Sequence, residues 1–153
     1  MSITTADVLA FLRKHRLAVQ ASRSPGESVQ AALVGIAVTD SLEIVFDTLT
    51  STRKTQNLRR SPHIALVIGG WSDRDERTVQ YEGIADEPTG VELDRVKSAY
   101  FATWPDGPSR ANWPGLTYIR VRPTWIRYSD FGQDPPLIVE FSGDQLRAAA
   151  GEG

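Results

Sequence analysis

Short segments in which apolar and polar residues alternate recur along the chain. In the clearest of them, Leu42, Ile44 and Phe46 alternate with Glu43 and Asp47, a period of two that is typical of a strand with one buried face. These segments follow one another over short connections without regular strand–helix alternation, which argues against a parallel α/β fold. We therefore expect a mainly β fold, a small antiparallel barrel of six or seven strands. The expected strands are residues 17–22, 29–39, 42–48, 64–68, 77–86, 116–128 and 137–141.

Three amphipathic segments predict two to three short helices inserted between these strands. Thr4 and Asp7 form a capping arrangement before the first helix. The second helix is expected to begin near Ser51 and to end before Pro62, and the third covers residues 89–104, with apolar residues at three- and four-residue spacing.

A length of 153 residues favours one domain over residues 1–153, with residues 1–4 and 144–153 expected to be flexible. Pro123 predicts a bend or bulge in the last long strand. The loop at residues 104–113 is rich in tryptophan and proline. It either packs the third helix onto the barrel or forms the mouth of a cleft between two subunits.

Composition excludes or disfavours several classes of function. Cysteine is absent, which excludes disulfides and thiolate metal sites. The only histidines are His15 and His63, which disfavours a histidine metal centre. A net charge of −2 disfavours nucleic-acid binding, and the longest apolar run, residues 31–38, is too short to span a bilayer. We expect a cytoplasmic protein without metal, nucleic-acid or membrane partners.

The segment at residues 46–58 holds the most informative chemistry. A strand ends at Thr48, a hydroxyl-rich turn follows, and Arg53 and Lys54 open the next helix. Cations are unfavourable at a helix N-terminus unless an anion lies beside them, and Arg and Lys are the side chains that bind phosphate. Two interpretations remain open. Either Ser51 caps the helix and the cations are solvated, or the segment binds a phosphate group.

The order of motifs along the chain resembles the pyridoxamine 5'-phosphate oxidase family. The strand end Phe46-Asp47-Thr48, followed by Arg53-Lys54, resembles the flavin-binding segment of that family. The segments at residues 78–85 and 122–130 resemble two later strands of its barrel. The resemblance covers about residues 5 to 135 and implies a split β-barrel.

The same resemblance implies a function. It implies a homodimer that binds FMN in a cleft between subunits and transfers hydride between the flavin and a small, unknown substrate. Because the flavin carries that chemistry, no catalytic side chain is expected. A reductase that uses the deazaflavin F420, or a carrier that binds flavin without turnover, are the alternatives. The Arg-x-His substrate motif of the vitamin oxidases is absent, so pyridoxamine phosphate is not the expected substrate. The expected cofactor-binding residues are Thr48, Ser51, Arg53 and Lys54 around the phosphate, with Asp47, Val34, Thr78, Trp125 and Arg127 as further contacts.

Overall fold

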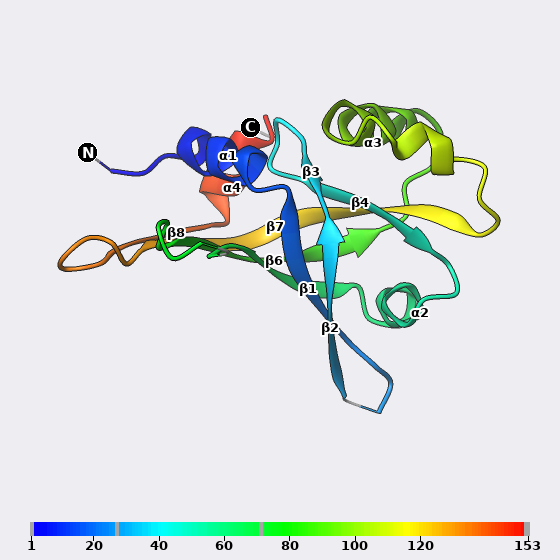
Figure 1. The fold of residues 1–153 in the computed structure, drawn as a ribbon, viewed down its shortest axis with the longest axis horizontal. Helices are drawn as coiled ribbons and strands as arrows, with labels where there is room; N and C mark the ends of the chain where they lie inside the picture. The colour runs from blue at the N-terminus through cyan, green and yellow to red at the C-terminus, as the bar shows by residue number, and fades with distance from the viewer. Residues whose placement is uncertain (1, 27, 71, 152–153) are drawn as a thin grey trace.

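A single strongly curved antiparallel sheet dominates the computed structural model, which describes residues 2–26, 28–70 and 72–151 (Figure 1). Its eight described strands are β1 (Leu17–Arg23), β2 (Val29–Gly35), β3 (Ala37–Val38), β4 (Ile44–Leu49), β5 (His63–Gly69), β6 (Arg77–Asp86), β7 (Leu116–Asp130) and β8 (Leu137–Ser142). The order across the sheet is β2-β1-β5-β6-β7-β4-β3, and β8 pairs with β7. β2 and β3 are consecutive in the chain but lie at opposite edges of the sheet. The chain thus joins the two edges, and the expected split β-barrel is confirmed.

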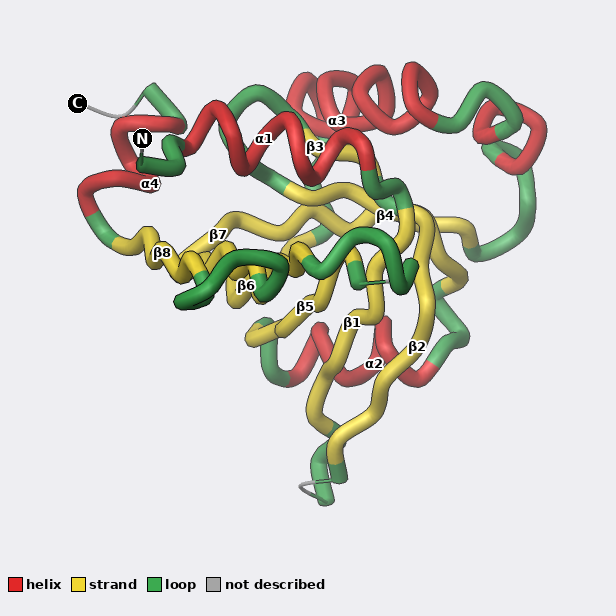
Figure 2. The backbone as a smooth tube through the Cα atoms, turned by 60° about the vertical axis from the view of Figure 1, so that its left-hand side comes forward, coloured by secondary structure: helices red, strands yellow, loops and turns green. Residues whose placement is uncertain are grey.

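Four helices decorate this barrel among the described residues, together with a 3₁₀ turn at Gly107–Arg110. They are α1 (Thr5–Lys14), α2 (Arg53–Arg60), α3 (Gly90–Thr103) and α4 (Asp144–Ala149). Figure 2 shows α1, α3 and α4 along one side of the sheet and α2 alone on the opposite side. None of the described helices is long and apolar enough to cross a membrane.

The core fills the barrel with the inward-facing residues of the alternating strands. Phe46, Tyr81 and Ile126 are completely or almost completely buried, as the period of two predicts. The Tyr81 hydroxyl donates to the carbonyl oxygens of Leu42 at 2.7 Å and Val121 at 3.1 Å. A buried hydroxyl without a partner would be costly, so these bonds allow a tyrosine at the centre of the core.

Several local predictions are confirmed. Thr4 and Asp7 form the complete capping box of α1. The bulge expected at Pro123 is a register shift between β6 and β7 after Glu82. A Cβ atom at Gly83 would overlap the carbonyl oxygen of Arg122, so a glycine allows the close approach of the two strands. Trp104 packs its indole against Gly35, whereas Trp113 is exposed. The sequence also predicts a hairpin turn at residues 69–75, and Trp71 within it lies outside the described residues.

Three boundaries differ from the sequence-based expectation. The strand predicted at residues 29–39 is two strands, because the chain turns at Ile36, whose N–H donates to the carbonyl of Arg16 at 2.8 Å. The second helix begins at Arg53, with Thr52 rather than Ser51 as its N-cap. Within the tail at residues 144–153, Asp144–Ala149 forms the helix α4, whose Leu146 is buried in the barrel core.

Candidate functional site

A chain of threonine hydroxyls holds the turn between β4 and α2. Thr48 Oγ1 lies 3.2 Å from Thr52 Oγ1, and the hydroxyls of Thr52 and Thr55 both donate to the carbonyl of Leu49, at 2.8 and 2.9 Å. Thr52 also caps α2 by accepting from the N–H of Thr55. These bonds fix the direction in which the first turn of α2 points.

Two cations occupy that first turn without compensating charge. Arg53 and Lys54 are the first two residues of α2, and its first turn contains no acidic residue. In the described part of the chain, neither side chain forms an ion pair, and neither backbone N–H has an acceptor. Free N–H groups, the positive end of the helix dipole and two side-chain cations therefore gather at one place, which suits an anion.

Lys54 is partly buried in this position. Burial lowers the pKa of its ammonium group, because a charged amine loses hydration there without gaining a carboxylate partner. A bound dianion would supply that partner. The residues present therefore fit a phosphate group.

The orientation of Arg53 depends on residues that the sequence pattern did not indicate. The Gln30 amide lies between Asn57 and Arg53: its oxygen accepts from Asn57 Nδ2 at 2.9 Å or, with the amide turned over, from Arg53 Nη1 at 2.9 Å. Asn57 Nδ2 donates in turn to Ser22 Oγ at 3.2 Å. Ser22 and Gln30 are paired across β1 and β2, far from α2 in sequence, so only the sheet pairing could have predicted this contact.

Two more predicted residues flank Thr48 and the start of α2, and only one of them lies beside Arg53. Ser51 is exposed in the turn beside Arg53. The Asp47 carboxylate accepts from the Tyr100 hydroxyl at 2.9 Å and from Arg110 Nε at 3.0 Å. Successive strand residues point to opposite faces, so Asp47 lies on the α3 side of β4 and Thr48 on the other. The carboxylate of Asp47 thus anchors the loop after α3.

The remaining predicted contacts lie in other parts of the barrel. Val34 is buried in β2. Thr78 and Arg127 belong to the end of the β6–β7 pair that is remote from β4, and the Arg127 guanidinium lies 5.4 Å from the Trp125 ring centre. Thr48 pairs with Thr117, eight residues before Trp125, or about 26 Å along the strand. One protomer does not bring these residues to the start of α2.

Comparison with known families decides the relationship of this chain. The family profile of pyridoxamine 5'-phosphate oxidase matches residues 4–130. The chain belongs to this family. Its split barrel agrees with that membership. No curated protein matches the chain at a significant level.

Solved structures of this fold bind different cofactors. A heme-binding protein from Mycobacterium smegmatis matches with a TM-score of 0.81 and 16% identity, over 97% of this chain and 62% of that protein. The chain described here thus spans less than two thirds of the length of the heme-binding protein. A pyridoxamine 5'-phosphate oxidase-related, FMN-binding protein from Nostoc punctiforme matches with a TM-score of 0.68 and 13% identity over 93% and 90% of the two chains. The heme storage protein HutZ from Vibrio cholerae matches with a TM-score of 0.67 and 8% identity over 80% and 91%. At these identities the likeness concerns the fold.

Proposed function

We propose that this protein binds FMN with the phosphate at the start of α2 and acts as a flavin-dependent oxidoreductase. The observation that carries the proposal is the pair Arg53 and Lys54, two cations at a helix N-terminus without a carboxylate partner among the described residues. FMN, when bound, supplies hydride and electron transfer through its ring. An FMN-binding relative of the same fold supports this choice of cofactor.

The side chains at the start of α2 have separate roles in this proposal. Arg53 offers a planar fork of donors to the phosphate oxygens, and Lys54 offers a compact charge. The free N–H groups of the first turn add two more donors. Gln30 holds the guanidinium of Arg53 in place before the ligand arrives, so less side-chain entropy is lost on binding.

A second copy of the chain would complete the cofactor cleft. The outward faces of β2, β1 and β5 bring Leu33, Val19 and Val67 into one row, and Leu33 and Val67 are 57% and 45% exposed. An apolar row of this kind on a sheet favours association, and the cofactor contacts predicted at Trp125 and Arg127 would then come from the partner. Light scattering should give a dimer at micromolar concentration, and Leu33→Lys should give a monomer; a monomeric wild-type protein would refute the dimer.

Heme binding is the second candidate, because two relatives of the same fold are heme-binding and heme storage proteins. Heme iron usually needs an axial ligand such as histidine. His15 is packed against Phe11, with ring centres 4.3 Å apart, and lies 3.7 Å from Asp75. His63 is exposed at the start of β5, so it is the histidine whose removal would test this candidate.

The absorbance spectrum of the purified protein, before and after addition of each cofactor, tests these candidates. We expect two visible flavin bands and saturable binding of FMN. A protein that binds F420 instead would be the alternative reductase, and a Soret band that disappears in His63→Ala would show heme binding. A protein that binds none of these would refute the proposal.

A separate measurement distinguishes an oxidoreductase from a flavin carrier. The bound flavin is reduced without oxygen and then mixed with oxygen or candidate acceptors. We expect it to be reoxidised faster than free flavin by at least one acceptor. Reoxidation no faster than that of free flavin would indicate a carrier.

A further inference from the structure

A cleft separate from the start of α2 lies between α3, α4 and the middle of β7. Its volume is about 650 Å³, within the range of small-molecule sites. Arg122 and Pro123 on β7 form one wall, and Leu146 and Arg147 on α4 form another. These helices lie on the side of the sheet opposite α2 (Figure 2), so this cleft is distinct from the proposed FMN phosphate site.

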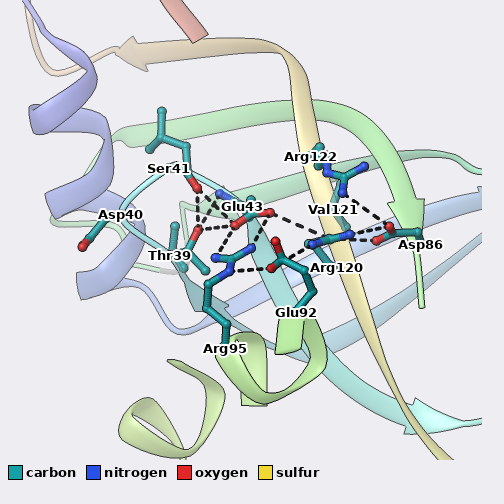
Figure 3. A network of polar contacts seen from close by, with 12 residues as sticks. Thr39, Asp40, Ser41, Glu43, Asp86, Glu92, Arg95, Arg120, Val121 and Arg122 are labelled. Atoms are coloured by element: carbon teal, nitrogen blue, oxygen red, sulfur yellow. Dashed lines mark hydrogen bonds and ion pairs between the residues drawn. The ribbon is translucent and has the colours of Figure 1, made fainter. Parts of the chain in front are cut away.

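The floor of the cleft is a network of charged side chains around two buried ones. The side chains of Glu43 and Arg120 are only 9% and 4% exposed. Arg120 donates to both carboxylate oxygens of Asp86, at 2.9 and 2.6 Å, and Arg95 donates to both oxygens of Glu43, at 2.8 and 3.1 Å (Figure 3). Glu92 joins the network through Arg95, at 2.6 Å. The floor is therefore polar, rigid and internally paired.

Stability alone does not explain this network. Well-packed apolar residues usually stabilise a fold as well as buried ion pairs do, and a cleft with convergent charged groups is a typical binding site. Burial by itself would raise the pKa of Glu43, but hydrogen bonds from Arg95, Thr39 and Ser41 outweigh burial and lower it. The carboxylate therefore stays ionised at neutral pH and keeps both arginines in place.

The rim of the cleft offers cationic groups that the network does not use. The side chains of Arg122 and Arg147 are 60% and 58% exposed. Arg122 lies 3.8 Å from Asp86, which Arg120 already binds through both oxygens, and Arg147 pairs within its own helix with exposed Asp144. Four arginines and two glutamates line the cleft, and Asp86 and Asp144 pair with Arg120 and Arg147, so an anion would be attracted by the two exposed guanidinium groups of the walls and not by a net positive charge.

We propose that this cleft binds a small organic anion, a molecule with a carboxylate, sulfonate or phosphate group on an apolar body. Arg122 and Arg147 would bind the acidic group from the two walls. Pro123 and Leu146 would pack against the apolar body of the ligand. The charged groups on the floor of the cleft are already paired with one another, so they would not bind a second anion. This site does not depend on FMN binding.

The test uses 1-anilinonaphthalene-8-sulfonate, a fluorescent sulfonate with an apolar body, and its neutral counterpart N-phenyl-1-naphthylamine. Both are titrated into the protein with the α2 site saturated by FMN or, if FMN does not bind, left free. We expect saturable binding of one sulfonate per chain. Arg122→Gln and Arg147→Gln should each weaken it about tenfold, the effect of losing one charge-assisted hydrogen bond.

Two control variants separate this cleft from general effects of charge. Arg74→Gln removes an exposed arginine from the β5–β6 turn, and Arg53→Ala removes a cation from α2; neither should change the affinity for the sulfonate. Sulfonate and neutral probe binding equally would overturn the proposal. Loss of affinity in either control equal to that in Arg122→Gln, or no saturable binding to wild type, would also overturn it.

Discussion

Arg53→Ala provides the sharpest test of the phosphate site, because phosphate binding and solvation predict different outcomes. If the guanidinium binds the FMN phosphate, its removal takes away a charge-assisted hydrogen bond worth about 1.5–3 kcal/mol. The affinity for FMN should then fall about ten- to a hundredfold. Lys54→Ala should cost somewhat less, because solvent can replace a point charge more easily than a planar fork.

The structure also predicts what should not change. Arg53 is exposed at the start of α2 and has no ion-pair partner among the described residues, so the apo-protein gains little from it. A cation is unfavourable at that end of a helix, and Arg53→Ala should leave the melting temperature of the apo-protein unchanged or slightly higher. Riboflavin lacks the phosphate, and its affinity should change less than about twofold.

Titrations of FMN and riboflavin into wild type and Arg53→Ala, followed by flavin fluorescence, measure both effects. Arg60→Ala is the matched control, because Arg60 is an exposed cation in the last turn of the same helix. Equal losses for FMN and riboflavin would mean that the phosphate lies elsewhere. An unchanged affinity for FMN in Arg53→Ala would refute the phosphate site altogether.

Three further changes test other parts of the structure. Burial lowers the pKa of Lys54 from 10.5, so the folded apo-protein releases this proton more easily than the unfolded chain. Its stability should rise with pH between the lowered pKa and the usual one, and in thermal melts Lys54→Met should stabilise the apo-protein at pH 7 and abolish that rise. Glu43→Gln should destabilise the protein by about 1.5–3 kcal/mol in urea at pH 7, because it removes the charged acceptor of Arg95 and leaves buried Arg120 with Asp86 as its paired carboxylate. Because the pKa of Glu43 is lowered in the folded state, the wild type loses this stabilisation only as pH falls below the usual 4.5. The control variant Glu82→Gln changes an exposed glutamate and should cost less than about 0.5 kcal/mol. Leu146→Ala should cost about 2–5 kcal/mol in the same assay, whereas a negligible loss would mean that α4 is not packed on the core.

Local features of the sequence were sufficient to predict most of the elements. The alternation around Ile44 and Phe46 predicts β4, and Thr4 with Asp7 predicts the start of α1, because neighbouring residues supply both signals. Pro123 indicated the bulge for a similar reason, since proline cannot donate to a sheet ladder. The break between β2 and β3 at Ile36 was missed, because an apolar run does not show where a strand ends at one sheet edge and the chain crosses to the other.

The candidate site divides in the same way. Thr48, Arg53 and Lys54 lie within seven consecutive residues, so their spacing in the sequence was sufficient to predict that they lie close together. Whether Lys54 is buried, and that Gln30 rather than a carboxylate meets Arg53, depend on the pairing of β1 with β2 and their position beside α2.

The network around Glu43 and Arg120 depends wholly on the tertiary structure. The sequence pattern placed Glu43 on the polar, outward face of a strand. In the structure its carboxylate is bound by Arg95 from α3 and lies near Arg120 from β7. The sequence by itself determined which segments form strands and where two cations open a helix, because those signals come from residues a few positions apart. Only the folded barrel decided which distant charges become buried partners, because the cost of burying a charge depends on the side chains that surround it in space.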